Sequence, residues 1–275
     1  MDKSTILNVE IDNISQAQLL ERLKQGVLVT PNVDQIVKMQ KDWDYYDIVR
    51  RAEWVVCDSK ILYLCSKFLK KSIPEAIPGS SFFPAFYEYH KDDENCRIFL
   101  LGAMDGVADK AMERINSKLG RKMVVGAYSP SYGFEKKQEE NEDIYKRINE
   151  SGANVVLVGV GCPKQEKWID AHKSRMPGVD IWMALGATID FEAGNIKRAP
   201  KIIQKLYLEW LYRLFQEPKR MYRRYLIDDP KFFWHFLKQL LGFYKNPFEE
   251  QDQQDRQCDD KDQEPHDEIQ QQEEK

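Results

Sequence analysis

One segment of the chain runs from a buried strand through a glycine turn directly into a helix. It reads Asn154-Val155-Val156-Leu157-Val158-Gly159-Val160-Gly161-Cys162-Pro163-Lys164-Gln165-Glu166-Lys167-Trp168. The uninterrupted apolar run over 154–158 is typical of a strand that is buried on both faces of a sheet. Beyond the two glycines, apolar side chains recur at the three- and four-residue spacing of a helix. This order of elements is the repeating unit of a parallel sheet.

The same unit recurs along residues 1–195. Further apolar runs of strand length lie at 26–30, 53–57, 97–101, 123–126 and 180–185. Helical spacing fills intervals between them at 34–51, 58–70, 105–119, 138–151 and 163–175. Strands separated by helices of this length imply parallel crossovers. We therefore predict an α/β fold with a Rossmann-like, mostly parallel sheet that helices cover on both faces.

Composition divides the 275 residues into three regions. We predict a Rossmann-like core over 1–195 and a helical appendage over 196–248, which is rich in aromatic and basic residues and is broken by prolines. Residues 249–275 contain eight glutamines and only two apolar side chains. Such a segment buries too little apolar surface to offset the entropy lost on ordering, so we expect an acidic disordered tail.

The formal net charge of −4 is the sum of two unlike parts. The tail carries twelve acidic and three basic residues, whereas residues 1–248 carry 33 acidic and 38 basic ones. Positive charge is densest over 197–231, with ten Lys or Arg against four Asp or Glu. That segment is either a solvated helical face or a surface for anionic lipid headgroups. In the second case the aromatic side chains at the interface are Trp210, Tyr212, Phe215, Tyr222, Tyr225, Phe232, Phe233 and Trp234.

Several classes of protein do not fit the sequence. No apolar run approaches the ~18–20 residues of a membrane-spanning helix, and no signal peptide is visible. The five cysteines are scattered and odd in number, which indicates reduced thiols in the cytoplasm. No Cys or His spacing indicates a metal site. Basic and aromatic residues also alternate in nucleic-acid-binding proteins, but no recognition motif is present, so we expect no nucleic-acid partner.

Polar residues follow the predicted strands at the edge where a parallel sheet binds its ligands. Thr30 and Asn32 follow the first strand, and as a bare Thr-Pro-Asn they form either a turn or part of a site. Asp58 follows the second strand, where a partly desolvated carboxylate acts as a general base or else caps the next helix. Gly102 follows the third strand in a turn that either contacts a ligand or only connects two elements.

The turn from Gly159 to Gln165 carries the strongest signal. Gly159 and Gly161 let the backbone approach a ligand, the helix start offers N–H groups to an anion, and Lys164 adds a positive charge. A phosphate or diphosphate site and a plain strand–helix connector both remain open. A nucleotide-dependent oxidoreductase would need the G-x-G-x-x-G pattern, in which this turn lacks the third glycine.

Taken in order, these motifs resemble those of the WecG/TagA/CpsF glycosyltransferases, glycosyltransferase family 26. The resemblance spans about residues 5–240 and is strongest over 158–169. The other motifs are Val29-Thr30-Pro31-Asn32, Cys57-Asp58-Ser59, Ile77-Pro78-Gly79-Ser80, Leu100-Leu101-Gly102, Gly106-Val107-Ala108, Gly186-Ala187-Thr188-Ile189-Asp190-Phe191, Arg198-Ala199-Pro200 and the run from Glu209 to Arg220.

The resemblance implies a bacterial enzyme of cell-surface polysaccharide or teichoic acid biosynthesis. It would move N-acetylmannosamine, or a related hexosamine or uronic acid, from a UDP-sugar to a polyprenyl-diphosphate-linked sugar, with inversion and without a metal or other cofactor. It would act in the cytoplasm, peripherally at the inner face of the cell membrane. We also expect a homo-oligomer, either a dimer or a trimer.

The resemblance also assigns roles to residues of this chain. Asp58 matches the general base, Thr30 and Asn32 match a polar pair near the donor, and Gln165 matches a contact to the donor sugar or acceptor. Four arginines would neutralise the leaving diphosphate: Arg213, Arg220, Arg223 and Arg224. Two departures from the family pattern lie near the site, Ser59 where glycine is common and Ser81-Phe82 where an acidic residue is common. A membrane scaffold that has lost activity is an alternative, but Asp58, Thr30 and Gln165 are all retained.

Overall fold

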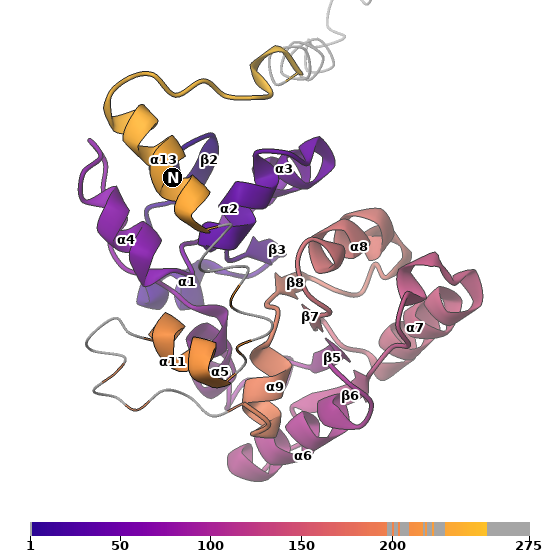
Figure 1. Cartoon of the computed structure of the whole chain (residues 1–275). Helices are drawn as coiled ribbons and strands as arrows, with labels where there is room; N and C mark the ends of the chain where they lie inside the picture. Colours follow the sequence, from indigo (N-terminus) through magenta and orange to yellow (C-terminus); the bar gives the residue numbers. More distant parts are fainter. Residues whose placement is uncertain are drawn as a thin grey trace, which may run out of the picture.

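The computed structural model describes residues 2–196, 200, 203, 209–216, 218, 222 and 229–251. Its centre is a six-stranded sheet in the order β4-β3-β8-β7-β5-β6, in which every neighbouring pair is parallel (Figure 1). The strands are β3 (Gly26–Val29), β4 (Trp54–Val55), β5 (Ile98–Gly102), β6 (Val124–Tyr128), β7 (Val155–Gly159) and β8 (Ile181–Ala184). The predicted α/β fold, with its six strands, is confirmed.

Alternate side chains of the strands enter two separate cores. Along β3, Val27 and Val29 face one core and Leu28 the other, as expected for a strand with a side-chain period of two. The first core is covered by α2 (Val33–Met39), α3 (Trp43–Arg51), α4 (Lys60–Ser66), α7 (Gln138–Ser151) and α8 (Lys164–His172). The second is covered by α1 (Gln16–Arg22), α5 (Gly79–Tyr89), α6 (Val107–Leu119) and α9 (Thr188–Ala193).

The helices that follow the adjacent strands β5 and β7 leave the sheet toward opposite faces. Helix α6 follows β5 and packs in the second core, whereas α8 follows the neighbouring strand β7 and packs in the first core. Loops that diverge from adjacent parallel strands leave a crevice at the carboxyl ends, which is where open α/β sheets bind ligands. The topology therefore places a ligand site at the edge that the sequence predicts.

Three local predictions need correction. The helix expected over 34–51 is two helices, because Asp42 caps α3 by accepting a hydrogen bond from the N–H of Tyr45 at 3.1 Å. Residues 58–70 form the shorter helix α4. An antiparallel hairpin of β1 (Lys3–Ile6) and β2 (Val9–Asp12) was not expected at all.

The C-terminal helix α13 (Asp229–Leu240) packs against the core near this hairpin (Figure 1). Phe232 and Phe236 are buried in the first core, so the prediction that Phe232 sits at a membrane interface is wrong. Gln239 donates to the carbonyl of Thr5 and accepts from the N–H of Leu7, both at 2.9 Å. The remaining described elements are α11 (Glu209–Gln216) and the 3-10 turns Phe134–Lys136 and Lys173–Arg175.

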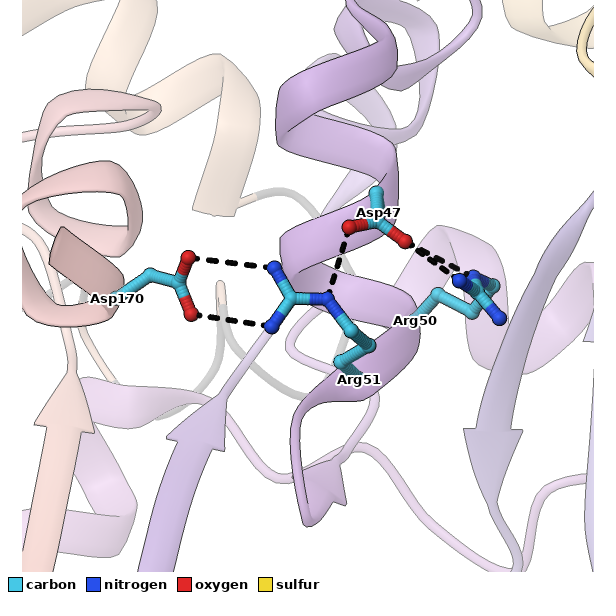
Figure 2. A network of polar contacts seen from close by, with 4 residues as sticks. All are labelled: Asp47, Arg50, Arg51 and Asp170. Carbon is cyan, nitrogen blue, oxygen red and sulfur yellow. Dashed lines mark hydrogen bonds and ion pairs between the residues drawn. The ribbon is translucent and has the colours of Figure 1, made fainter. Parts of the chain in front are cut away.

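Helices α3 and α8 are joined at the surface by a network of charges (Figure 2). Arg51 extends one guanidinium between two acids: it donates to Asp170 through two nitrogens, at 3.3 and 3.2 Å, and to Asp47 at 2.8 Å. Arg50 binds the same Asp47 from the other side, at 2.6 Å. Lys167, one turn before Asp170 in α8, lies 2.9 Å from Asp42, the residue that caps the start of α3. These contacts join α3 and α8 at the surface of the molecule.

Candidate active site

The loops after β3 and β4 lie side by side at the carboxyl edge of the sheet. The backbone N–H of Asp58 donates to the carbonyl of Pro31 at 3.1 Å, so the loop that carries Thr30 and Asn32 is tied to the loop that carries Asp58. Thr30 is buried, while Asn32 and Asp58 are half-buried. The structure thus brings together three of the residues that the sequence singles out.

Asp58 is not the cap of the following helix. Ser59 caps α4, and its hydroxyl oxygen accepts from the N–H of Ile61 at 3.2 Å. The Oδ1 atom of Asp58 accepts instead from the N–H of Gly79 at 3.0 Å, the first residue of α5. The carboxylate is therefore held between β4 and the start of α5, and Ser59 stabilises α4 by capping it.

Asn32 has a defined structural task. Its Oδ1 accepts from the N–H of Gln35 at 3.2 Å, and the Oε1 of Gln35 accepts from the N–H of Asn32 at 2.9 Å. This reciprocal pair is a capping box at the start of α2. The Asn-x-x-Gln spacing that produces it is visible in the sequence, although no role was predicted there for Gln35.

The three glycines predicted for the site, Gly102, Gly159 and Gly161, have different structural roles. The N–H of Ala103 donates to the carbonyl of Gly159 at 3.1 Å, and a Cβ on Gly102 would lie 2.5 Å from that same oxygen. A Cβ on Gly159 would lie 2.7 Å from the carbonyl oxygen of Gly186. Gly102 and Gly159 therefore allow neighbouring loops to touch. Gly161 has a φ of +88° and faces open space, so it is the glycine of the three that leaves room for a ligand.

Lys164 and Gln165 begin α8 and point to different surroundings. The Nζ of Lys164 is 3.2 Å from Glu135 and lies 4.8 Å from the centre of the Tyr132 ring. A bound phosphate would share this cation with Glu135. Gln165 is buried, and its Oε1 accepts from the N–H groups of Gly161 at 3.2 Å and Gly186 at 3.1 Å. It thus holds the loop after β7 to the loop after β8.

A buried carboxyl group lies directly behind these loops. Oε1 of Glu166 accepts from Nε2 of Gln165 at 3.0 Å and from Nε2 of Gln35 at 3.3 Å. Burial raises the pKa of Glu166 to about 7, although hydrogen bonds from its own backbone N–H and from the two glutamines oppose that shift. Nearby, the thiol of Cys162 donates to the hydroxyl of Tyr45 at 3.1 Å. Glu166 lies within the motif at 158–169, but the sequence does not indicate this role. Its partner Gln35 is 131 residues away along the chain.

The chain contains one Asp-x-Asp triplet outside the tail, Asp42-Trp43-Asp44. Both carboxylate oxygens of Asp42 lie 2.9 Å from Lys167, and the Asp44 side chain is exposed. Within the described ranges, no group of three or more His, Cys, Asp or Glu is placed to hold a metal ion together. The carboxylate of Asp42 thus serves the contact between α3 and α8.

Of the four arginines predicted to act in the appendage, only Arg213 lies among the residues that the structure describes. Arg213 belongs to α11, and its side chain is not described. Arg220, Arg223 and Arg224 lie outside the described residues, as do residues 252–275 of the acidic tail. None of the helices in the described part of the chain is both long and apolar enough to cross a membrane.

Comparison with known proteins shows to which family the chain is related. The model of the glycosyl transferase WecG/TagA/CpsF family matches residues 4–246, nearly the whole chain. The chain belongs to the WecG/TagA/CpsF glycosyltransferase family. This family match covers the sheet, the loops at its carboxyl edge and the C-terminal helix α13. The resemblance seen in the sequence is therefore confirmed.

This WecG/TagA/CpsF glycosyltransferase is similar in sequence to enzymes of named activity. It is 27% identical over 245 residues to the N-acetylglucosaminyldiphosphoundecaprenol N-acetyl-beta-D-mannosaminyltransferase of Staphylococcus aureus strain MW2. The match covers 86% of this chain and 92% of the relative. The proteins of the same name from strains NCTC 8325 and COL match to the same extent. The chain is thus distantly related to enzymes that act on lipid-linked N-acetylglucosamine.

Proposed function

We propose that this glycosyltransferase moves a sugar from a UDP-sugar to a polyprenyl-diphosphate-linked sugar, with inversion and without a metal ion. The sugar is N-acetylmannosamine or a related hexosamine or uronic acid, in the biosynthesis of teichoic acid or another cell-surface polysaccharide. The relatives named for transfer to N-acetylglucosaminyldiphosphoundecaprenol support this substrate class. The observation that carries the proposal is the position of Asp58, tied to the loop of Thr30 and Asn32 and held at the start of α5.

Asp58 is the general base in this reaction. The acceptor hydroxyl oxygen attacks the anomeric carbon of the donor while the bond from that carbon to the diphosphate oxygen breaks. The bonding electron pair leaves with UDP, and the carboxylate of Asp58 takes the proton of the acceptor hydroxyl. Attack on the face opposite the leaving group inverts the anomeric centre. The hydrogen bond from Gly79 to Asp58 Oδ1 fixes the direction in which this carboxylate points.

The leaving diphosphate needs positive charge and hydrogen-bond donors. Thr30 supplies a hydroxyl at the end of β3, and Lys164 supplies a cation beyond the glycine turn. Arg213, Arg220, Arg223 and Arg224 neutralise the remaining charge in this proposal, which is the task that a divalent metal performs in other enzymes. Such electrostatic stabilisation acts on the charge that develops in the transition state, so loss of the arginines should lower kcat.

The lipid acceptor requires contact with a membrane surface. Helix α13 buries Phe232 and Phe236 but exposes a second apolar face, and Trp234 has 60% of its surface exposed. The other exposed apolar side chains of this segment are Phe233, Leu237, Leu240, Leu241 and Phe243. We propose that this face meets the inner surface of the cell membrane, where Lys231, Lys238 and Lys245 favour anionic lipids. Flotation with phosphatidylglycerol vesicles would test it, and unchanged binding of Trp234→Ser would contradict it.

Substitution of the base tests the reaction directly. Asp58→Asn keeps the size of the side chain and an oxygen for Gly79 but cannot accept the proton, so we expect kcat to fall by about 10²–10⁴-fold. UDP binding, measured by calorimetry, should stay within threefold of the wild type. The assay combines purified protein, a panel of UDP-sugars and a synthetic lipid-diphosphate acceptor, with the product mass measured. Wild-type turnover by Asp58→Asn would remove Asp58 as the base, and absence of any transfer by the wild type would favour a scaffold.

A further inference from the structure

Two glutamines at the candidate site have the same arrangement on different helices. Gln35 of α2 and Gln165 of α8 both point Nε2 at Oε1 of Glu166, at 3.3 and 3.0 Å. Both point Oε1 at backbone N–H groups of loops at the carboxyl edge of the sheet: Asn32 for Gln35, and Gly161 and Gly186 for Gln165. One carboxyl group thus stands behind three loops that follow the neighbouring strands β3, β8 and β7.

The carboxyl group determines which way each amide faces. A glutamine side chain has a donor end and an acceptor end, whereas a carboxyl oxygen that carries no proton only accepts hydrogen bonds. If either amide were reversed, its oxygen would face the oxygen of Glu166 and its NH₂ group would face a backbone N–H. Both contacts would be repulsive in a buried site. Because Gln35, Gln165 and Glu166 are all buried, water cannot replace the lost partners.

We propose that Glu166 is a positioning residue: by orienting Gln35 and Gln165 it holds the loops after β3, β7 and β8 in the arrangement that binds the nucleotide-sugar donor. This role deepens the proposed function and rests on it, because the same loops carry Thr30, Asn32 and Gly161. Glu166 does not touch the substrate. It acts only through the two glutamines, whose oxygen atoms fix the backbone of the loops.

The surroundings of Glu166 fit a residue that accepts hydrogen bonds and gives none. No described side chain donates to its second oxygen, Oε2, which is buried. Tyr45 of α3 lies close enough for the two groups to influence each other electrostatically, and its hydroxyl accepts from Cys162. Lys38 of α2 is the cation that favours the ionised form of Glu166. Of these neighbours, Tyr45 also takes part in a side-chain hydrogen bond with Gln35. Because an amide NH₂ group has two hydrogens to donate, Gln35 can serve Glu166 and Tyr45 together.

The first test measures the loops themselves and needs no ligand. Hydrogen exchange of the N–H groups of Asn32, Gly161 and Gly186 is compared in the wild type, Glu166→Gln and Glu166→Met. Methionine removes the acceptor, so we expect exchange at these three amides to speed up by at least about tenfold. Glutamine keeps an acceptor oxygen, so exchange should stay within about threefold. Equal protection in Glu166→Met and wild type would overturn the proposal, as would equal loss in both variants.

Exchanging the partners provides a second test that survives if Glu166→Met fails to fold. Gln35→Glu alone sets two carboxyl groups against each other, so we expect the Kd for UDP to rise by at least about tenfold. Adding Glu166→Gln restores a donor opposite an acceptor and should bring the Kd back to within about threefold. A double variant that binds UDP no better than Gln35→Glu would overturn the proposal.

The two readouts separate this role from the proposed function. If the wild type did not bind UDP, the proposed donor would be wrong, while the exchange rates of the three amides would still report on the role of Glu166 in holding the loops. Asp170→Met, one turn further along α8 and on its outer side, is the matched control. It should leave both the three amides and UDP binding within about threefold of the wild type, since the contact of Asp170 with Arg51 lies at the surface.

Discussion

Two polar clusters hold α8 against its neighbours, one at the surface and one in the core. The surface cluster consists of Asp47, Arg50, Arg51 and Asp170, whose formal charges cancel (Figure 2). The buried cluster lies behind the loops of the candidate site and contains Tyr45, Cys162 and Glu166, with Gln35 and Gln165. The surface cluster joins α3 to α8, whereas the buried cluster joins α2 to α8 and Tyr45 of α3 to the loop before α8. The carboxyl group of the buried cluster, Glu166, is closed off from water.

Exposure determines what each cluster contributes. The Arg51 side chain is 45% exposed and that of Asp170 29%, so solvent screens their attraction and either side chain can turn to water if its partner is lost. Gln165 and Glu166 are each about 1% exposed. Removal of one buried partner leaves the others without a hydrogen bond and without water. We therefore expect the loss of one contact to lower the free energy of unfolding several-fold more in the buried cluster than in the surface cluster.

The largest effect should follow from Gln165→Met, compared with Arg51→Met. Methionine at 165 keeps the length of the side chain but leaves the N–H groups of Gly161 and Gly186 without their acceptor and removes one of the two donors to Oε1 of Glu166. We expect the free energy of unfolding to fall by about 3–5 kcal/mol. Arg51→Met should lower it by less than about 1 kcal/mol. Urea denaturation measures both, and equal losses would contradict the contrast between the clusters.

Much of the fold follows from the sequence because strands buried on both faces form long apolar runs. All six strands of the sheet lie within apolar runs, although the edge strands β4 and β6 are only partly buried. The edge at which Thr30, Asn32 and Asp58 meet was predictable too. The β1–β2 hairpin was missed because its turn, Leu7-Asn8, contains no glycine or proline. Leu7 adopts a φ of +58°, which is unusual for leucine, and the side chain is buried.

Other features depend on contacts that no sequence pattern reveals. Helix α13 has apolar residues on two faces, so periodicity shows that Phe232 is apolar but not whether protein or lipid covers it. The structure shows that Phe232 packs in the first core. Likewise, Asn32 and Gln35 form a capping box that local spacing predicts, whereas the contact from Gln35 to Glu166 requires the tertiary fold.

The pH dependence of stability should differ between the clusters. Burial raises the pKa of Glu166 from 4.5 to about 7, so the folded protein holds a proton that the unfolded chain has already released. Stability from this group is fully present below pH 4.5 and is lost as the pH rises to about 7. Glu166→Gln removes the titration, so its free energy of unfolding relative to wild type should rise by about 2 kcal/mol between pH 5 and pH 8.

Asp170→Asn is the control for this measurement, because it removes a negative charge from the exposed side of the same helix. Urea denaturation of wild type, Glu166→Gln and Asp170→Asn at pH 5 and pH 8 gives the comparison. If Glu166→Gln and wild type lose stability in parallel over this range, Glu166 is ionised at both values and its burial does not govern the titration.

The smallest effect should come from the pair Arg51 and Asp170, measured by a double-mutant cycle. Their bidentate contact lies at the surface, so we expect a coupling free energy of about 0.5–1 kcal/mol. Raising the salt concentration from 0.05 to 1 M (about 14 to 3 Å in Debye length) should remove most of it, since exposed charges are screened. Asp47 holds Arg51 from the other side, at 2.8 Å, so the guanidinium stays ordered when Asp170 is replaced. A coupling above about 2 kcal/mol that salt does not change would show that this cluster behaves like the buried one.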